Sequence, residues 1–563
     1  MKIIQKSLKL ATLIFLVLII INFFPAFFYK KEINNNTLPS EYVKGVYHIH
    51  SLFSDGLGSV EDITTAAGSL GLDFVILTDH GVPNLNCANS TSYKGKVLLI
   101  GASEFSLDCG HLAAAGFKIR DYKFPLEPQE SINEVNDDDG VTFVAHPFDG
   151  RIPWTDWDIK NFTGIEILNS YSCAKKIGFL GIFSFPLEYL VNKDYSLLET
   201  VYYPQKNLDK WDMFNRNGRY MGIFALDAHS KLPITKKILL RFPSYYSMFR
   251  IFNVYVRTGE KLPKDPFKAS NQIIRSIKAG HFFSAIEGLS SANGFDSYFD
   301  STIEGRINMG DISNTYEGKI NIILPFDFRT NIILRRDGRI IKRIRNNIKN
   351  ELKINIGKPG VYRSEIFITD SRYSDLPWIV TNPFFLGKPQ VNKISDNRII
   401  LEEKQLVRDH SLFHIENNPS SKATLNILTD EKIKEIKYTL KKEDKSENYW
   451  VSLALRKKLD FSGFNSISFY SRSEKNMRYW LELRTGEGKN ELWYRHSFLS
   501  GPKWRKNELE FKKFHCINKK DSDKIIDISN INSLFISINN SIVFNPDISG
   551  TLLIKSIKLL KFK

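Results

Sequence analysis

Two histidines two positions apart, His48 and His50, open the part of the chain in which we expect chemistry. Residues two apart in a strand project from the same face, so both imidazoles point the same way. The strand runs into the turn sequence Ser54-Asp55-Gly56, which places the Asp55 carboxylate just beyond its carboxyl end. Two imidazoles and a carboxylate at one place indicate a metal site. An exposed edge strand with incidental histidines is the alternative reading of this motif alone.

Apolar strands that end in a polar residue recur along residues 45 to 290. Helical stripes of apolar residues alternate with these strands, which is typical of a parallel sheet. Barrels of the α/β class assemble their sites at the carboxyl ends of such strands. We therefore expect an α/β fold here, with its site at the strand ends. The apolar runs are 74–78, 97–102, 141–145, 164–168 and 221–226, and His, Asp, Glu or Asn follows each within a few residues.

Nine side chains in these positions are candidate metal ligands. One Zn²⁺ needs three or four ligands, so nine predict two or three ions that share a bridging carboxylate. Imidazole and carboxylate ligands without thiolate suit Zn, Mn or Fe about equally well. For a single member such as His111, a hydrogen-bonded core histidine is the alternative. The nine are His48, His50, Asp55, His80, Glu104, His111, His146, Asp227 and His229.

These motifs resemble, in chain order, those of the PHP (polymerase and histidinol phosphatase) superfamily. The resemblance covers about residues 44 to 290. Ile273 to Ala285 also looks like the closing helix and strand of the CehA/McbA-like phosphoesterases, in which an arginine commonly holds the place of His281. The matching motifs are His48-Ile49-His50 with Ser54-Asp55-Gly56, Leu77-Thr78-Asp79-His80, Gly101-Ala102-Ser103-Glu104 with Gly110-His111-Leu112, Ala145-His146-Pro147 and Leu226-Asp227-Ala228-His229-Ser230.

The resemblance implies a distorted (β/α)7 barrel with up to three metals at its mouth and hydrolysis of a phosphate ester. Independently of the family, clustered divalent ions bind phosphoryl oxygens, lower the pKa of a bridging water to near neutrality and offset the charge that develops on the leaving oxygen. By the resemblance, His48, His50, Glu104 and Asp227 hold one ion, Glu104, His111 and His146 a second, and Asp55, His80 and His229 a third.

A phosphatase also needs a cation to orient its substrate. Arg151, five residues after His146, is our candidate, and we expect it in the catalytic centre with Asp227 and His229. Lys118 and Arg216 are further candidate cations. A solvated surface position is the alternative for each of the three basic residues.

The amino terminus carries an uncharged, almost wholly apolar run from Leu10 to Phe28, preceded by Lys2, Lys6 and Lys9. Nineteen such residues can span a bilayer, and we expect residues 1–31 to be an uncleaved membrane anchor. A cleaved signal peptide is the alternative. The lysines favour a cytoplasmic amino terminus, with the bulk of the chain periplasmic or at the cell surface.

The net charge of +16 is unevenly distributed. Residues 45 to 300 have 25 Lys and Arg against 29 Asp and Glu, whereas residues 301 to 563 have 47 against 31. The catalytic part is therefore not basic, which argues against a nucleic-acid partner. A basic rear half suits anionic lipid head groups or acidic envelope polymers.

The four cysteines form no CxxC pair and no dense disulfide pattern. They do not decide whether the compartment is oxidising. A Cys87 to Cys109 bridge is conceivable, and we expect unpaired cysteines in the core.

Behind a linker at 32–43 and the phosphoesterase domain at 44–298, helical patterns give way to strands separated by turns. We expect a small β-sandwich at 299–388 and, after a polar linker at Lys388 to Asn397, a β jelly roll at 398–563. Its strand rhythm resembles carbohydrate-binding jelly rolls. Sugar rings can stack on tryptophans, for which core packing is the alternative. The tryptophans concerned are Trp480, Trp493 and Trp504.

Together these features predict a membrane-anchored, extracytoplasmic, metal-dependent phosphoesterase that uses two or three divalent ions. Its expected partners are a phosphate-ester substrate, the membrane and a cell-envelope glycan or anionic polymer. The alternative is a catalytically inactive surface protein of the same fold that binds glycans or envelope polymers.

Overall fold

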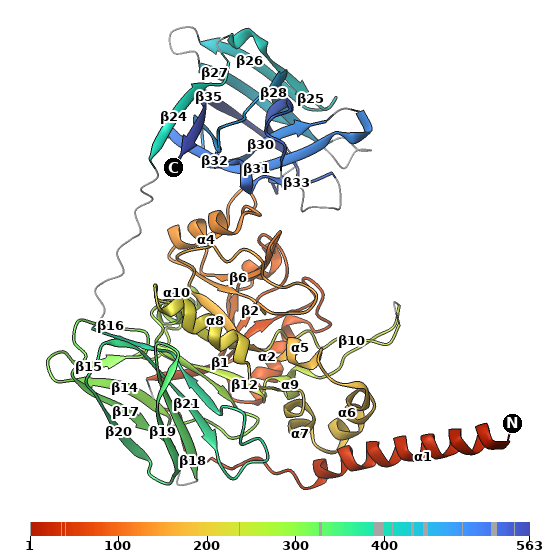
Figure 1. Cartoon of the computed structure of the whole chain (residues 1–563), viewed down its shortest axis with the longest axis vertical. Helices are drawn as coiled ribbons and strands as arrows, with labels where there is room; N and C mark the ends of the chain where they lie inside the picture. The colour runs from red at the N-terminus through yellow and green to blue at the C-terminus, as the bar shows by residue number, and fades with distance from the viewer. Residues whose placement is uncertain are drawn as a thin grey trace. The chain divides into compact units, whose positions relative to one another are not determined.

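The chain divides into two compact units, seen in a computed structural model (Figure 1). Unit 1 comprises Met1–Lys118 and Ile132–Lys393, and unit 2 comprises Ile119–Ser131 and Ile394–Lys563. The predicted linker Lys388 to Asn397 lies outside the described residues. These are 2–34, 36–39, 41–235, 237–325, 329–387, 399–407, 409–428, 433–442, 449–486, 488–518, 526–544 and 547–563.

The largest sheet of unit 1 has twelve strands. At its centre β1 (Tyr42–Ile49), β2 (Phe74–Leu77) and β4 (Val97–Gly101) are parallel. β12 (Phe252–Arg257) and β13 (Phe282–Ile286) then add antiparallel strands beside β1. The other strands of this sheet are β3 (Ser92–Lys94), β16 (Ile312–Ser313), β18 (Thr330–Arg336), β19 (Arg339–Asn347), β21 (Gly360–Ile368), β22 (Ile379–Thr381) and β23 (Phe384–Leu386).

A second sheet of unit 1 has five strands and faces the first across the core. The strands are β5 (Ser103–Leu107), β6 (Gly110–Ala115), β7 (Val141–Val144), β8 (Gly164–Asn169) and β9 (Met221–Ala225). The first three strands, β5, β6 and β7, pair antiparallel, and the pairs β7–β8 and β8–β9 are parallel. Single bridges join Ile49 to Ala228 and His80 to Glu104, so the strand ends of the two sheets meet where the predicted ligands lie.

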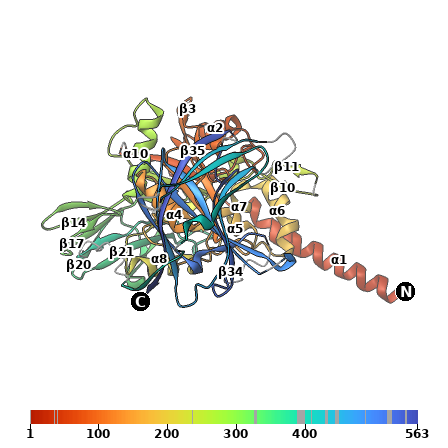
Figure 2. The same cartoon turned by 90° about the horizontal axis from the view of Figure 1, so that it is seen from above.

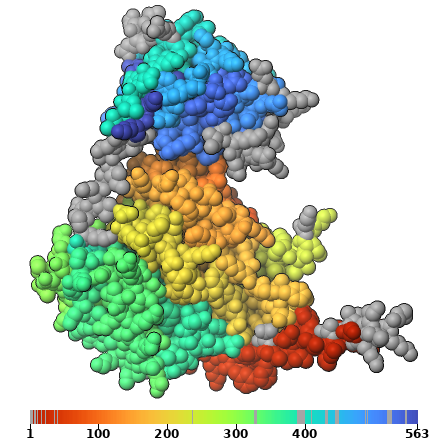
Figure 3. All heavy atoms as spheres, in the orientation of Figure 1, coloured from red at the N-terminus to blue at the C-terminus, as the bar shows by residue number. Residues whose placement is uncertain are grey.

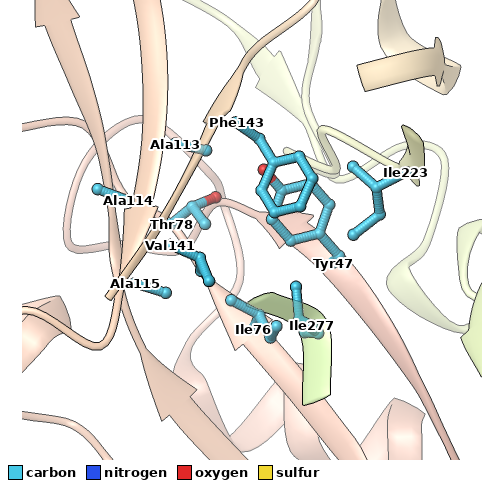
Figure 4. A pocket seen from close by; sticks show the side chains of 10 residues that line it. All are labelled: Tyr47, Ile76, Thr78, Ala113, Ala114, Ala115, Val141, Phe143, Ile223 and Ile277. Carbon is cyan, nitrogen blue, oxygen red and sulfur yellow. The ribbon is translucent and has the colours of Figure 1, made fainter. Parts of the chain in front are cut away.

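The space between these sheets is filled by side chains. The apolar residues of the facing strands are buried because each sheet is covered on both faces. One cavity of about 10 Å³ remains among Tyr47, Ile76, Phe143, Ile223 and Ile277 (Figure 4). That volume admits about one water molecule. This cavity is therefore too small for a substrate.

Helices cover unit 1 and connect its strands. Ser59 begins α2 with a capping box, in which its hydroxyl accepts a hydrogen bond from the Asp62 N–H. Asp265 caps α10, whose buried Ile273, Ile274 and Ile277 lie on one face. The helices are α2 (Val60–Ser69), α3 (Leu85–Ala88), α4 (Pro128–Asp137), α5 (Ser170–Ala174), α6 (Phe179–Val191), α7 (Lys193–Leu198), α8 (Gln205–Asn215), α9 (Tyr245–Met248) and α10 (Pro266–Lys278). A hairpin of β10 (Leu232–Pro233) and β11 (Leu239–Leu240) follows the last predicted ligand.

The predicted fold class, an α/β distorted (β/α)7 barrel, is wrong. The chain is largely β, with several sheets and few helices. A two-residue turn joins β5 and β6 into an antiparallel hairpin, whereas a parallel sheet was predicted. Antiparallel β12 and β13 then carry the first sheet into the strands after residue 300.

The spanning helix of the same prediction is also wrong. Among the described residues, no helix is long and apolar enough to cross a membrane. The apolar run Leu10 to Phe28 is divided between α1 (Lys2–Phe23) and the 3-10 helix η1 (Phe24–Phe27), which contains Pro25. Only Leu10 to Phe23 of that run is α-helical, about 21 Å at ~1.5 Å per residue, against a hydrocarbon core of about 30 Å.

Residues from 296 to 386 add a β layer to unit 1 (Figures 1 and 2). The hairpin of β18 and β19 turns at Asp337 and Gly338, whose φ angles of 52° and 81° suit a two-residue turn. Arg363 of β21 is buried and binds both Asp212 of α8, at 2.7 Å, and Glu365, at 2.5 Å. The remaining strands form a four-stranded sheet of β14 (Asp296–Ser301), β15 (Gly305–Asn308), β17 (Gly318–Ile323) and β20 (Glu351–Ile356).

Unit 2 is built from two six-stranded sheets around one apolar core. The first contains β24 (Ile400–Gln405), β26 (Lys422–Leu428), β27 (Ile433–Leu440), β29 (Ser466–Ser473), β32 (Arg505–Glu510) and β35 (Ile548–Phe562). The second contains β25 (Phe413–Asn417), β28 (Trp450–Leu459), β30 (Met477–Thr485), β31 (Leu492–Ser500), β33 (His515–Cys516) and β34 (Ile531–Asn539). Three short 3-10 helices are η2 (His410–Leu412), η3 (Gly488–Asn490) and η4 (Phe511–Lys513).

A segment from far upstream completes unit 2. Residues 119–131 belong to it, whereas the predicted domain ranges place them in 44–298 and not with 398–563. Tyr122 joins the core of unit 2 and bridges to Val543. The buried Glu127 carboxylate accepts hydrogen bonds from the Ser497 N–H and hydroxyl, both at 2.7 Å. All four cysteines of the chain are buried and free, so Cys87 and Cys109 form no bridge.

Candidate metal centre

His48 reaches the strand-end site through a bulge rather than through regular alternation. The register of β1 against β2 shifts between Tyr47 and Ile49, and His48 has a φ of 67°. His50 follows the end of β1. The Nε2 atoms of the two imidazoles lie 3.1 Å apart.

Three of the predicted ligands have strained backbone conformations. His48, His146 and Asp227 have φ angles of 67°, 28° and 52°, in a region that residues other than glycine seldom adopt. Each such residue costs on the order of 1–3 kcal/mol, which the surrounding structure must offset. Strain of this kind is concentrated at functional sites, and here it aims three predicted ligands at one point.

Glu104 lies at the centre of the cluster and is buried. Its Oε1 lies 2.9 Å from His111 Nδ1 and 2.9 Å from His146 Nε2. Its Oε2 faces three further imidazole nitrogens. These are His80 Nδ1 at 3.1 Å, His50 Nε2 at 3.2 Å and His48 Nε2 at 3.3 Å.

Asp55 and Asp227 complete the set of nine. Asp55 Oδ1 lies 3.2 Å from His229 Nε2, and Asp227 Oδ1 lies 3.4 Å from His50 Nε2 and 3.7 Å from His48 Nε2. The structure thus brings all nine predicted side chains together. Three groups have ligand atoms within 4.8 Å of one another: His50, Asp55, His80 and His229; His48, His50 and Glu104; and His80, Glu104 and His111. They overlap with the predicted sets without matching them, because His50 and His80 each belong to two groups.

Buried polar atoms without a hydrogen-bond partner mark the cluster as suited to cations. Among the described residues these include Glu104 Oε2, Asp55 Oδ1, His80 Nδ1 and His146 Nδ1. A buried polar atom left unpaired costs about 1–3 kcal/mol. Carboxylate oxygens and imidazole nitrogens that face one another without hydrogen bonding have the chemistry of a divalent-metal ligand shell.

Charge interactions within the cluster shift the pKa values of its members. Burial alone raises the pKa of Glu104, but neighbouring histidines, His48 above all, bring that pKa well below its usual range. Burial alone lowers the pKa of His50, but Asp227 and Glu104 outweigh it and raise that pKa to about 9. Burial lowers the pKa of His80 to about 4. The carboxylates are thus ionised, and without metal, protons on some of the imidazoles balance their charge.

Two buried carboxylates that support the cluster were missed in the sequence. Glu166 Oε1 lies 2.5 Å from His48 Nδ1, and its Oε2 accepts hydrogen bonds from the His146 N–H and Asn169 Nδ2, both at 2.8 Å. Asp79 accepts hydrogen bonds from the Ser51 N–H at 2.8 Å and the Ser54 hydroxyl at 2.6 Å, and so holds the loop that carries Asp55. A glutamate inside the apolar run 164–168 was the available signal, because a buried carboxylate needs partners.

The predicted cation Arg151 has an exposed side chain, and its backbone N–H donates to Asp149 Oδ1 at 2.8 Å. Two residues that were not predicted contact members of the cluster. Lys231 Nζ lies 3.1 Å from Asp55 Oδ2. The Tyr171 ring packs on that of His229, with centroids 4.9 Å apart.

For the other two candidate cations, Lys118 and Arg216, the structure shows interactions of the backbone. The Lys118 N–H donates to Asp138 Oδ2 at 2.9 Å. Arg216 caps the carboxyl end of α8.

The three tryptophans of unit 2 have partners within it. Trp480 is buried, and its indole N–H donates to the Ser541 hydroxyl at 3.0 Å. The Arg484 guanidinium lies 4.0 Å from the ring centroid of Trp493. Lys555 Nζ lies 4.5 Å from that of Trp504. Their binding of sugar rings stays a prediction.

Comparison with known proteins gives similarity to solved structures only. No family model and no curated protein matches the chain. A two-domain protein of Bacteroides vulgatus, described as containing a predicted PHP-like metal-dependent phosphoesterase, is 15% identical, with 63% of this chain and 100% of that chain covered and a TM-score of 0.28. A family 11 carbohydrate-binding module of Clostridium thermocellum is 19% identical over 28% of this chain and 95% of its own, with a TM-score of 0.23. A family 30 module is 14% identical over 28% and 98%, with a TM-score of 0.19.

Proposed function

We propose that unit 1 is a metal-dependent hydrolase of phosphate esters. The observation that carries the proposal is Glu104 Oε2, a buried carboxylate oxygen that faces three imidazole nitrogens at 3.1 to 3.3 Å without a hydrogen bond. Two or three divalent ions (Zn, Mn or Fe) held by the three ligand groups would supply Lewis acidity and lower the pKa of a water.

The residues around the cluster have supporting roles in this proposal. Glu166 fixes the ring of His48 so that its Nε2 faces Glu104, an arrangement common beside metal-bound histidines. Asp227 and His229 lie against Asp55 and His50, where the attacked phosphorus would be held. Lys231 and Arg151 are the cations that we assign to the phosphoryl oxygens.

The test is metal analysis of the purified chain together with assays on a soluble phosphomonoester and a soluble phosphodiester. We expect bound Zn, Mn or Fe, and hydrolysis that chelation abolishes. His48→Ala and Glu104→Gln should each remove metal and activity in a protein that still folds. His414→Ala is the matched control, because that histidine is exposed in unit 2.

Full hydrolysis by folded Glu104→Gln would contradict the proposal. Bound metal without turnover of either ester would favour the alternative, a catalytically inactive surface protein.

A further inference from the structure

Unit 1 exposes large apolar side chains on the side where α6 and the β10–β11 hairpin lie (Figures 1 and 2). Leu190 is 81% exposed, Phe179 69% and Phe28 68%. The hairpin projects from the surface (Figure 3) and carries two exposed isoleucines at its end. We call these six residues the apolar flank: Phe28 after η1, Phe179, Ile182 and Leu190 of α6, and Ile234 and Ile238 of the hairpin.

The elements that carry the flank adjoin one another. Asn192, which follows α6, donates hydrogen bonds to the carbonyls of Ala26, at 3.2 Å, and Tyr29, at 2.9 Å, and so ties η1 to α6. The ring of Phe242, two residues after β11, packs against Tyr189 of α6 with centroids 4.6 Å apart. Soluble monomers seldom expose apolar surface over several adjoining elements, and such surfaces usually bind a membrane or a partner.

The segments that form the flank are strongly basic. Residues 24–31, 170–193 and 230–242 together contain nine Lys or Arg and one acidic residue, Glu188, which is buried. Asp62, Asp149 and Asp55 pair with three of these cations, and a positive surplus remains. The rest of the catalytic part is therefore net acidic, since residues 45 to 300 as a whole carry 25 basic and 29 acidic residues.

Lysine beside exposed apolar groups is typical of surfaces that meet anionic lipid. Protein interfaces are depleted in lysine. The composition of the flank therefore favours a bilayer over a protein partner.

The flank begins at the rim of the metal centre. Lys231, whose Nζ lies 3.1 Å from Asp55 Oδ2, directly precedes β10. Tyr171, which packs on His229, lies in α5, and α6 follows after a few residues. Leu52, in the loop that carries Asp55, is also exposed. A surface held by the flank would thus lie beside the mouth of the cluster.

We propose that the apolar flank seats unit 1 on an anionic bilayer and that the metal centre hydrolyses phosphate esters carried by lipids in that bilayer. The second half rests on the proposed function. In the reaction a water oxygen bonds to phosphorus, the ester P–O bond breaks, and the released oxygen takes up a proton to leave as an alcohol. The flank holds the lipid head group near the cluster without touching the reacting atoms.

The test compares the full chain with the double variant Ile234→Asp/Ile238→Asp. The matched control is Ile303→Asp/Ile348→Asp, which changes two isoleucines that are at least as exposed and lie between strands away from the flank. Binding is measured by flotation with vesicles of phosphatidylcholine, with and without phosphatidylglycerol. Turnover is measured on phosphatidic acid and phosphatidylglycerol in vesicles and on soluble 4-nitrophenyl esters.

We expect the flank variant to lose at least tenfold in vesicle binding and in turnover of vesicle-borne ester, with turnover of the soluble ester unchanged. The control should behave as the unchanged chain, and binding should fall without phosphatidylglycerol. Equal vesicle binding by the flank variant would overturn the inference. So would self-association that the flank variant abolishes in the absence of vesicles, which would assign the flank to a second copy of the chain.

Flotation requires no turnover, so the two proposals fail separately. Vesicle binding without hydrolysis of any ester would contradict the proposed function and leave the docking surface intact. Hydrolysis of soluble ester only, with no vesicle binding, would contradict the inference alone.

Discussion

Two buried glutamates, Glu104 in unit 1 and Glu482 in unit 2, have opposite surroundings. Glu482 accepts hydrogen bonds from Arg484 Nε at 2.6 Å and from Arg495 Nε at 2.5 Å, one at each carboxylate oxygen. Arg484 in turn lies against the rings of Trp493 and Phe535, at 4.0 and 4.2 Å from their centroids. In Glu104, by contrast, Oε2 faces imidazoles without a hydrogen bond.

The difference separates a charge cluster whose groups pair with one another from a cluster that could bind metal ions. Both regions are rich in charged and aromatic residues, so composition alone does not distinguish them. Buried polar groups in folded proteins are nearly always hydrogen-bonded, and exceptions need a physical explanation. The carboxylate of Glu482 has a partner at each oxygen, whereas the cluster around Glu104 has the ligand chemistry to bind cations.

The largest effect should come from removing the charge of Glu482. Breaking a buried ion pair by removing one partner costs about 3–5 kcal/mol. We therefore expect Glu482→Gln to lower the unfolding temperature of unit 2, followed by tryptophan fluorescence, and to leave turnover of a soluble ester unchanged. Glu403→Gln, at an exposed ion pair with Lys558, is the control and should not change the unfolding temperature. An unaltered unfolding temperature in Glu482→Gln would show that this carboxylate does not stabilise unit 2.

For Glu166 we expect a loss of metal affinity instead of a loss of stability. Partners that orient a metal-bound histidine usually contribute 10–100-fold to metal affinity. Glu166→Gln should weaken metal binding by about that factor, measured by titration calorimetry on the chelated protein. Glu365→Gln removes a buried carboxylate of the same unit from its ion pair with Arg363, so it should reduce stability and not metal affinity. Equal losses of affinity in both variants would mean that Glu166 acts only on stability.

A smaller, pH-dependent effect is expected at Glu127. Burial alone raises its pKa, but His496, the Ser497 N–H and Arg478 outweigh burial and lower that pKa below its ordinary value of 4.5. Because the folded pKa is the lower one, the stability that Glu127 contributes is complete above about pH 4.5 and is lost as pH falls through the folded pKa. Unfolding of unit 2 between pH 6 and pH 3 should show this loss in the unchanged chain and not in Glu127→Gln. Parallel pH profiles for the two proteins would refute it.

The smallest effect should come from Asp121, on the same segment. Its ion pair with Lys475 spans 2.8 Å, but the side chains are 66% and 51% exposed. Water screens such a pair, so Asp121→Asn should change the stability of unit 2 by less than about 1 kcal/mol. Chemical denaturation measures the change. If Asp121→Asn lowers the stability of unit 2 by more than Glu127→Gln does at pH 7, this ranking of the two residues is wrong.

Much of the cluster was predictable because its nine side chains lie at or near strand ends, and strand ends can be read from apolar runs. Glu166 and Asp79 were not predicted, since each acts through another residue and neither stands at a ligand position. The fold class was wrong because local periodicity identifies strands but not their partners. Whether β5 pairs with β6 or crosses over through a helix depends on a two-residue turn, and the pairing of β13 with β22 joins residues almost a hundred positions apart.

The membership of residues 119–131 in unit 2 has a consequence for how the protein is made. These residues leave the ribosome before most of unit 1, yet the rest of unit 2 begins only at Ile394, on the order of 260 residues later. At about 5–20 residues per second, the nascent chain must carry Tyr122 and the Glu127 carboxylate unburied for tens of seconds. During that interval the segment is a natural substrate for chaperones and proteases. Premature termination before Ile394 would leave it permanently unfolded within an otherwise intact unit 1.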